Sequence, residues 1–287
     1  MKIAVIFNID RPDTMGIYMQ RAFTSLGIQC DHFESRESER IPGGYDLYFR
    51  IDDDWYGQDL PDRLKPRALW ANDVHMSASM KNLRKMAPRY DFIFTPSTIG
   101  EREFRKRGLN AYWVSAGCDP EVHKNLLLPK KFDVGFVGTE GGIPRKFYLQ
   151  ELRERFPRSF IGQASHTQMS EIYSQSKVGF NLAVRDECFQ MRSYEILSCG
   201  AMLLMHRMAD ESTKRLGYEN GIHYVEFMTA SQMFDSIKFY LKHDEEREKI
   251  ARAGHEFTVS NHRYVDRVRE MLRIMQPLFS DQQFLAR

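Results

Sequence analysis

The stretch DECFQMRSYEILSCGAMLLM, Asp186 to Met205, holds two carboxylates eight positions apart, Glu187 and Glu195, and ends in an apolar run. Its periodicity predicts a helix over Met191 to Ser198 and a strand over Ala201 to His206. A carboxylate at a helix start can accept hydrogen bonds from ribose or sugar hydroxyls, while the free N–H groups and the helix dipole attract a diphosphate. The stretch therefore predicts an α/β unit with a nucleotide-sugar site where the loop enters the helix.

The rest of the second half alternates short apolar runs with helical periods. Such alternation is typical of a mostly parallel, doubly wound sheet covered by crossover helices. The further strands expected here are Asp133 to Val137, Ser159 to Gly162, Val178 to Ala183 and His223 to Phe227. The further helices are Arg145 to Arg155, Met169 to Ser176, Ala230 to Leu241, Glu245 to Val259 and Tyr264 to Gln276.

The first half shows the same alternation, which predicts a second α/β unit. Its expected strands are Lys2 to Asn8, Gln29 to Glu34, Tyr45 to Ile51, Arg67 to Ala71, Asp91 to Thr95 and Ala111 to Val114. Its expected helices are Met15 to Leu26, Ala78 to Lys85 and Gly100 to Gly108. The segment LLLPKK, Leu126 to Lys131, combines a proline with paired lysines and indicates a linker.

The length supports two domains, because 287 residues exceed what one hydrophobic core usually holds. We expect Rossmann-like domains over residues 1–125 and 132–262, with their sheets facing each other across a cleft. Residues 263–287 are expected to form a helix that packs back on the first domain.

Composition narrows the class of protein. The chain is 42% hydrophobic and 28% charged with a formal net charge of +2, an ordinary globular balance that gives no reason to expect nucleic acid as a partner. Its four cysteines lack zinc-site spacing and fit reduced thiols, and we expect neither a metal nor a cofactor. MKIAVIFNID enters a strand directly and no apolar run of about 18 residues follows, so we expect a soluble, cytoplasmic chain.

The basic, amphipathic C-terminal stretch has two interpretations. Arg267, Arg269 and Arg273 alternate there with Val268 and Leu272. Such a stretch could touch an anionic membrane. A packing helix with solvated arginines is the favoured interpretation.

Several segments of the second half, in this order and spacing, resemble a known family, the GT-B glycosyltransferases. They are FDVGFVGT (Phe132 to Thr139), MSEIYSQSKVGFNL (Met169 to Leu182), MRSYEILSCGAMLL (Met191 to Leu204), YENGIHYVEF (Tyr218 to Phe227) and Leu241 to Val268. The chain looks closest to the small CgeB-like branch, named after a spore-maturation protein. The first half matches more weakly, through RALWANDVHMS (Arg67 to Ser77), YDFIFTPS (Tyr90 to Ser97) and AGCDPEVH (Ala116 to His123).

The resemblance implies a hexosyltransferase-type enzyme that moves a sugar from a nucleotide-diphosphate donor to a hydroxyl acceptor of unknown identity. The second domain would hold the donor and the first the acceptor. A noncatalytic nucleotide-sugar binding module and a nucleotide-sugar epimerase remain alternatives, because both can use the same fold.

The resemblance also implies a role for each carboxylate of the acidic pair. Glu187 would lie near the donor sugar and Glu195 would bind the ribose hydroxyls; for Glu187 a plain loop carboxylate is the alternative. Arg192 lies one helical turn before Glu195, so it could hold a phosphate or form a structural ion pair with that carboxylate.

Two loops of the second half are candidates for donor contacts. VGTEGGIPRK, Val137 to Lys146, lies between a strand and a helix, so Gly138 and Thr139 could approach the phosphates while Arg145 or Lys146 supplies positive charge. A simple connecting turn is the alternative. His166, in the loop where the family places its base-binding residues, could contact a phosphate or ring, or be a solvated loop histidine.

The first half offers a general base. Asp73 and His75 follow an apolar strand at its carboxyl end, where open α/β sheets bind ligands. Either could take the acceptor proton in an inverting reaction, whereas the acidic pair suggests retention in related families. A helix cap at Asp73 is the alternative.

Two further acidic groups occupy loops of the first half. Asp10, Asp13 and Gly16 follow the first strand and could bind acceptor or begin a helix. The run Asp52 to Asp54 invites comparison with metal-binding carboxylate turns. A hydrated loop or acceptor contacts are favoured for it, because the segment lacks the second-half signatures.

Overall fold

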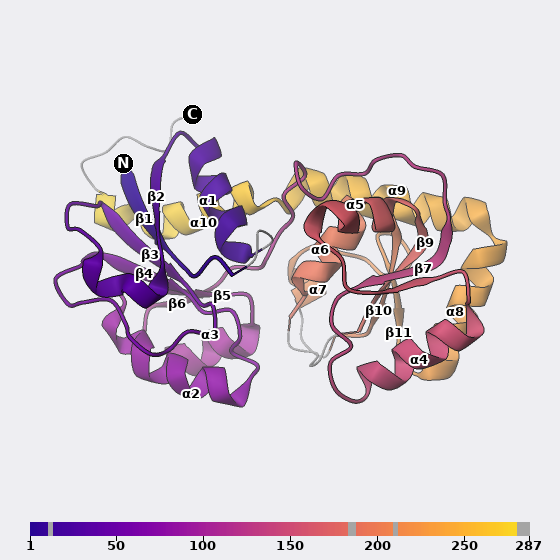
Figure 1. The fold of residues 1–287 in the computed structure, drawn as a ribbon, viewed down its shortest axis with the longest axis horizontal. Coiled ribbons are helices and arrows are strands. Elements are labelled where there is room, and N and C mark those ends of the chain that lie inside the picture. Colours follow the sequence, from indigo (N-terminus) through magenta and orange to yellow (C-terminus); the bar gives the residue numbers. More distant parts are fainter. Residues whose placement is uncertain (11–13, 183–187, 209–211, 280–287) are drawn as a thin grey trace. The chain divides into compact units, whose positions relative to one another are not determined.

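The protein folds into two compact α/β units, seen in the computed structural model (Figure 1). The structure describes residues 1–10, 14–182, 188–208 and 212–279. The first unit consists of residues 1–115 together with the described segment from Tyr264, and the second of Ala116–Arg263.

The first unit is built on a six-stranded parallel sheet. Its strands are β1 (Lys2–Ile6), β2 (Gln29–Phe33), β3 (Leu47–Ile51), β4 (Arg67–Trp70), β5 (Phe92–Thr95) and β6 (Ala111–Trp113). Its helices are α1 (Met15–Ser25), α2 (Ser77–Met86), α3 (Thr98–Arg105) and α10 (Tyr264–Ile274), with short 3-10 turns at Ser35–Arg40, Ala87–Arg89 and Gln276–Phe279. The strand order is β2-β1-β3-β4-β5-β6, so the chain reverses direction across the sheet between β1 and β3.

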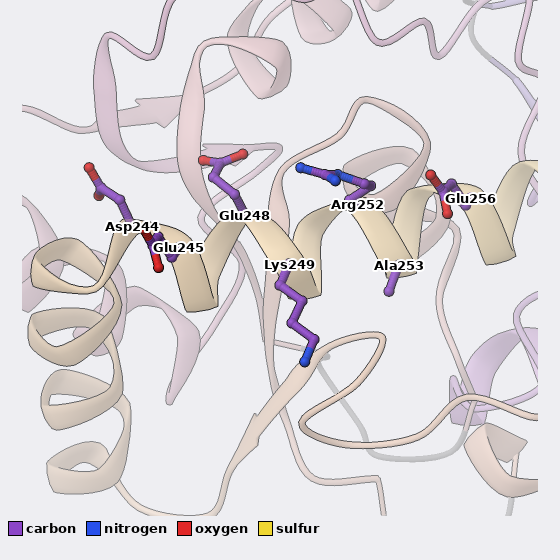
Figure 2. A pocket seen from close by; sticks show the side chains of 7 residues that line it. All are labelled: Asp244, Glu245, Glu248, Lys249, Arg252, Ala253 and Glu256. Carbon is purple, nitrogen blue, oxygen red and sulfur yellow. The ribbon is translucent and has the colours of Figure 1, made fainter.

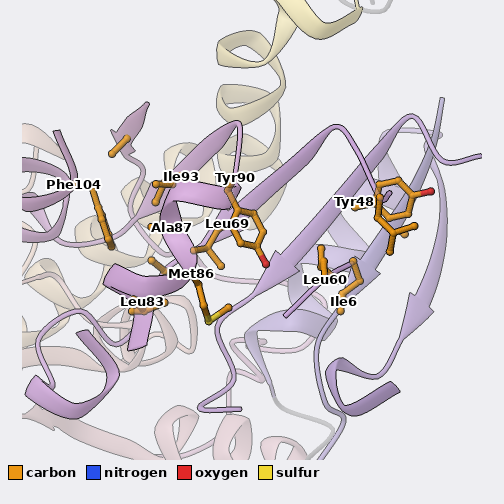
Figure 3. Close-up of a cluster of buried hydrophobic side chains, with 14 of the residues drawn as sticks. Ile6, Tyr48, Leu60, Leu69, Leu83, Met86, Ala87, Tyr90, Ile93 and Phe104 are labelled. Atoms are coloured by element: carbon orange, nitrogen blue, oxygen red, sulfur yellow. The ribbon is translucent and has the colours of Figure 1, made fainter. Parts of the chain in front are cut away.

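One face of this sheet forms a core with α2 and α3 (Figure 3). Leu83 and Met86 of α2 and Phe104 of α3 pack in the same cluster as Ile6 and Leu69 of the sheet. Burial of such side chains contributes ~1.5–3 kcal/mol each, which is why the apolar run in each predicted strand is a reliable signal.

The other face is covered by α1 and α10, which come from opposite ends of the sequence. Phe23 of α1 meets Phe49 of β3 edge to face at 5.4 Å, and Tyr18 stacks on Tyr264 of α10 at 5.4 Å. Val268 of α10 is buried as well. Arg267 is also buried, so the prediction that all arginines of this helix are solvated was wrong for that residue.

Two buried arginines fix the segment that follows β3. Arg50 donates to the backbone oxygens of Trp55 and Gln58 and pairs with Asp59 at 3.1 Å. Arg67 donates to three backbone oxygens between Leu60 and Leu64. A buried guanidinium needs several acceptors, and these contacts hold an irregular loop in one conformation, although Nε of Arg50 has no hydrogen-bond partner among the described residues.

The second unit is built on a five-stranded parallel sheet in the order β11-β10-β9-β7-β8. Its strands are β7 (Phe132–Val137), β8 (Phe160–Gly162), β9 (Ser176–Asn181), β10 (Met202–His206) and β11 (Val225–Phe227). Its helices are α4 (Arg145–Arg155), α5 (His166–Ser174), α6 (Met191–Ser198), α7 (Ser212–Arg215), α8 (Ala230–Lys242) and α9 (Asp244–Asn261). The strand order reverses between β7 and β9.

The second core joins this sheet to its helices. Phe136 and Phe180 of the sheet share a cluster with Leu152 of α4, Ile237 of α8 and Ile250 of α9. The predicted fold class of two doubly wound parallel sheets is confirmed by both strand orders.

Several predicted boundaries in the second unit were shifted, among them those of β9 and α5. β9 begins at Ser176, which pairs with Phe132, and the sheet ends at Asn181, so Leu182 already belongs to the following loop. α5 begins at His166 instead of Met169, because Ser165 and Gln168 form a capping box. His166 is therefore the first helical residue and not a loop histidine; its side chain lies outside the described residues.

All four cysteines are described and none forms a disulfide. In the part of the chain that the structure describes, no helix has the length and apolar character needed to span a membrane.

Candidate functional site

The strongest candidate site lies at the carboxyl ends of β7 and β9, where the second sheet reverses its strand order. Open α/β sheets bind their ligands at such a switch point, because the loops from the two strands turn to opposite sides and leave an opening. Here the loop of residues 138–144 leads from β7 into α4, and the segment after β9 leads into α6.

Arg192 lies in the first turn of α6 and reaches over this edge. Its Nε donates to the backbone oxygen of Val137 at 2.9 Å, and one terminal nitrogen donates to Oδ1 of Asn181 at 3.2 Å. Its guanidinium carbon lies 4.7 Å from the centre of the Phe136 ring, a cation–π contact. Contacts with both central strands therefore fix the position of this cation.

Arg145 is the first residue of α4 and is only 6% exposed. Its Nε donates to the backbone oxygen of Leu182 at 2.9 Å. Burial, and then the neighbouring charge of Arg192, lower the pKa of Arg145 to about 10. The group stays protonated at neutral pH, but its charge is destabilised by its surroundings.

The contacts of both arginines are neutral oxygens. Among the described residues, neither guanidinium pairs with a carboxylate: the partners are two backbone carbonyls and one amide. Arg145 is buried and Arg192 half-buried, and with no carboxylate partner among the described residues their charges cost free energy that a bound anion would recover. The N-termini of α4 and α6 at the same edge favour an anion as well.

Gly138 makes room for Arg192. Its φ of +149° is strained for other residues, and an added Cβ would lie 2.4 Å from a terminal nitrogen of Arg192. Glycine is therefore needed at the end of β7 for the guanidinium to reach the edge.

We expect Gly138→Ala to lower the stability of the second unit by about 1–3 kcal/mol, because it combines backbone strain with displacement of Arg192. Anion binding should weaken in parallel. Thermal denaturation with and without inorganic pyrophosphate measures both effects. Gly142→Ala in the same loop is the control, since a Cβ there meets no atom within 4 Å; equal effects of the two substitutions would contradict the assigned role of Gly138.

The other residues predicted for the donor fall into two groups. Thr139 and Lys146 are exposed on the loop and on the first turn of α4. Glu195 lies in α6 and is 7% exposed. The pKa of the nearby Tyr173 hydroxyl is raised mainly by burial; the charge of Arg192 lowers it and the charge of Glu195 raises it. For Arg192, the alternative of an ion pair with Glu195 was wrong, because the guanidinium binds the strands instead. Glu187 lies outside the described residues.

A second candidate edge lies at the carboxyl ends of β3 and β4 in the first unit. Asp73 follows β4 and accepts a hydrogen bond from Nδ2 of Asn72 at 3.2 Å. Nδ1 of His75 lies 3.9 Å from Oδ1 of Asp73, longer than a hydrogen bond. The alternative of a helix cap at Asp73 was wrong, because α2 begins after Met76 without a side-chain cap.

Asp52, which follows β3, holds the loop that carries Asp73. Its carboxylate accepts the backbone N–H groups of Asn72 and Asp73 at 3.2 and 3.0 Å and the hydroxyl of Tyr56 at 2.7 Å. Burial is the main cause that raises the pKa of Asp52 to about 6. Burial, and then the charge of Asp54, raise the pKa of Asp73 to about 6 as well. A carboxylate with such a pKa suits proton transfer near neutrality.

The remaining acidic candidates have structural partners. Asp53 accepts the N–H of Asn8 at 2.6 Å and the hydroxyl of Ser35 at 2.9 Å, so it ties β1 to β3 instead of lying in a hydrated loop. Asp10 is exposed and pairs with Arg36. No cluster of three or more metal-ligating side chains occurs within the described ranges.

Close packing explains the glycine at position 16. A Cβ there would lie 2.3 Å from the ring of Phe7, so glycine lets α1 approach the end of β1. Asp13 lies outside the described residues.

A surface hollow along α9 does not resemble a ligand site (Figure 2). It is lined by residues of that helix alone: Asp244, Glu245, Glu248, Lys249, Arg252, Ala253 and Glu256. Figure 2 shows Glu248 and Lys249 leaving the helix in different directions. Asp244 and Glu248 already pair with the buried Arg247, so the hollow is a charged, solvated helix face.

Sequence reasoning missed Asn181, which contacts Arg192 and is 2% exposed. A signal was present: a single amide ends the apolar strand SKVGFN immediately before the loop. An amide at that position cannot bury itself without a specific partner.

Two Rossmann-like units, each on a parallel sheet, are the architecture of the GT-B fold. The chain belongs to the family described as glycosyl transferase-like, which matches residues 126–273, more than half of its length. No curated protein matches the sequence.

Solved structures share the fold at low sequence identity. Sucrose-phosphate synthase from Thermosynechococcus elongatus is 12% identical with a TM-score of 0.66, covering 98% of this chain and 100% of its own. HepE from Anabaena in complex with UDP-glucose is 13% identical with a TM-score of 0.62, covering 96% and 100%. An α-glucosyltransferase in complex with UDP and a 13-mer DNA is 11% identical with a TM-score of 0.71, covering 96% and 99%. These similarities establish the fold.

Proposed function

We propose that this protein is a metal-independent glycosyltransferase that transfers a hexosyl group from a nucleoside-diphosphate sugar to a hydroxyl acceptor. The observation that carries the proposal is the pair of cations at the switch point, the buried Arg145 and the half-buried Arg192, whose hydrogen-bond partners among the described residues are all neutral. The family match supports glycosyl transfer, and the CgeB-like branch and a cytoplasmic location are part of the same proposal.

In the proposed reaction, the bond between the sugar C1 and the diphosphate oxygen breaks, and a bond from C1 to the acceptor oxygen forms. The leaving diphosphate gains negative charge as the bond breaks. Arg145, Arg192 and the free N–H groups of α4 and α6 would stabilise that charge without rearranging, because their positions are already fixed. Glu195 would bind ribose hydroxyls.

The acceptor proton needs a destination, and we assign it to Asp73. Its pKa of about 6 leaves the carboxylate ionised at neutral pH and still basic enough to accept a proton. Transfer assisted by this base would invert the configuration at C1. Glu187 remains a candidate for a contact with the donor sugar.

The experiment is a thermal-shift panel with UDP, GDP, ADP, CDP and TDP and their common sugars, on wild type and Glu195→Gln. A ligand at 100 times its Kd stabilises the folded state by about 2.7 kcal/mol, so one diphosphate should raise the Tm of wild type by several degrees. UDP is the first choice, because the structures of three neighbours contain it. The shift should shrink in Glu195→Gln, since a neutral amide is a weaker acceptor for ribose hydroxyls.

The outcomes separate the rival functions. Release of nucleoside diphosphate with an acceptor supports transfer, binding without turnover supports a noncatalytic module, and an isomerised sugar supports an epimerase. Turnover should persist in EDTA; loss of activity that Mn²⁺ restores would contradict the metal-independent mechanism.

A further inference from the structure

We infer that Asn181 is a positioning residue that holds Arg192 with a neutral oxygen, so that the site keeps its positive charge for the donor diphosphate. The inference rests on the proposed function and explains how this edge would select an anionic ligand.

The orientation of the Asn181 amide follows from its neighbours. A guanidinium can only donate hydrogen bonds, so the atom of Asn181 that faces Arg192 at 3.2 Å must be Oδ1. Nδ2 then faces the hydroxyl of Ser193 at 2.9 Å, which can accept. Asn181 is 2% exposed and Ser193 is fully buried, so water does not compete for either bond.

Aspartate would fit the same space, because a carboxylate and an amide have nearly the same shape. It would accept from Arg192, and the hydroxyl of Ser193 could turn to donate to its second oxygen. A carboxylate would also relieve the repulsion between Arg192 and Arg145. The folded state alone therefore does not require asparagine here.

Ligand binding does require it. With asparagine, Arg192 is oriented but not neutralised, and its charge remains available to an anion. With aspartate, Arg192 would already be paired with the carboxylate, so the diphosphate would have to compete for this cation. The carboxylate would also repel the negatively charged diphosphate at short range. Aspartate at position 181 would thus favour the stability of the folded protein, whereas asparagine favours diphosphate binding. Functional sites commonly sacrifice stability in this way.

Asn181→Asp tests the inference, with inorganic pyrophosphate, UDP and uridine as probes in calorimetric titrations. We expect the Tm without ligand to be unchanged or higher. We expect the Kd for pyrophosphate and for UDP to rise at least ~10-fold, because the new carboxylate would compete with phosphate for the charge-assisted hydrogen bonds of Arg192. Any binding of uridine, which carries no phosphate, should be unchanged.

Two further variants separate charge from packing. Asn220→Asp introduces the same charge at an exposed position of the same unit, where Oδ1 accepts from the N–H of Glu226, and should leave pyrophosphate binding within about twofold of wild type. Asn181→Ser removes the amide without adding charge. It should weaken pyrophosphate binding less than Asn181→Asp does, although it changes the shape of the site more.

A purely structural role for Asn181 predicts the reverse order, with the isosteric aspartate tolerated and serine the more damaging substitution; that order would overturn the inference. Pyrophosphate binding by Asn181→Asp as tight as by wild type would overturn it too, and would leave the proposed function standing. Failure of wild type to bind pyrophosphate or any nucleoside diphosphate would instead remove the proposed function, and the inference with it.

Discussion

Arg192→Met is expected to weaken the binding of the preferred nucleoside diphosphate by about 10- to 100-fold and to leave the protein folded. The substitution removes a cation that is aimed at the switch-point edge by Val137, Asn181 and the Phe136 ring. Loss of one charge-assisted hydrogen bond to phosphate costs ~1.5–3 kcal/mol. The protein should stay folded because methionine can pack on Phe136, but stability should fall by about 1–3 kcal/mol because the buried Oδ1 of Asn181 loses its donor.

The matched control is Arg153→Met, which removes the same charge from an exposed arginine of α4 that pairs with Glu140 at 2.8 Å. Titration calorimetry with the nucleoside diphosphate and with the bare nucleoside measures the effect. Equal weakening in both variants would mean that net charge, and not the placement of Arg192, governs binding.

Asp73→Asn is expected to lower the turnover rate by about 10²- to 10⁴-fold, the range usual for loss of a general base. Donor affinity should stay the same, because the proposed donor residues belong to the second unit. Initial rates of nucleoside diphosphate release at saturating donor measure the effect. Asp62→Asn, at an 85% exposed acid of the first unit, is the control. A small loss of rate in Asp73→Asn would remove the assignment of the base.

The pH dependence gives the same assignment a second test. Asp52 and Asp73 both have a pKa near 6 in the folded protein against an ordinary 3.8, so between these values the folded state binds more protons than the unfolded state. Their contribution to stability therefore increases as the pH falls from about 7 to 4. Turnover should fall over the same range, because the base becomes protonated.

Stability and activity should thus move in opposite directions on the acid side. The charge of Asp54 contributes to the raised pKa of Asp73, after burial, so it also affects the pH at which activity is half lost. In Asp73→Asn, the remaining turnover rate should no longer fall as the pH is lowered from about 7 to 4.

Most of the fold was readable from the sequence, because each strand is a short apolar run between helical periods. α4 and α6 begin and end at the predicted residues. The start of α5 was missed, because it is set by the capping box of Ser165 and Gln168. The spacing of apolar residues, on which the prediction was based, does not reveal such a cap. The shift of β9 follows from its pairing with β7, which only the three-dimensional structure supplies.

The sequence predicted which residues belong to the candidate site better than it predicted the contacts that each of them makes. The sequence pointed to Arg145 and Lys146 as equivalent charges, but the structure buries Arg145 and leaves Lys146 exposed. It also suggested that Arg192 pairs with Glu195 one turn away, whereas the cation contacts Val137 and Asn181, 55 and 11 positions away. Spacing along a helix predicts which side chains share a face, and it cannot predict a partner on a neighbouring strand.

The most direct test of the central claim is a structure of the complex with the nucleoside diphosphate that gives the largest thermal shift. The diphosphate is expected at the carboxyl ends of β7 and β9, with phosphate oxygens within hydrogen-bond distance of Arg145 and Arg192. A diphosphate bound anywhere else, or bound at this edge without contact to either arginine, would contradict that claim.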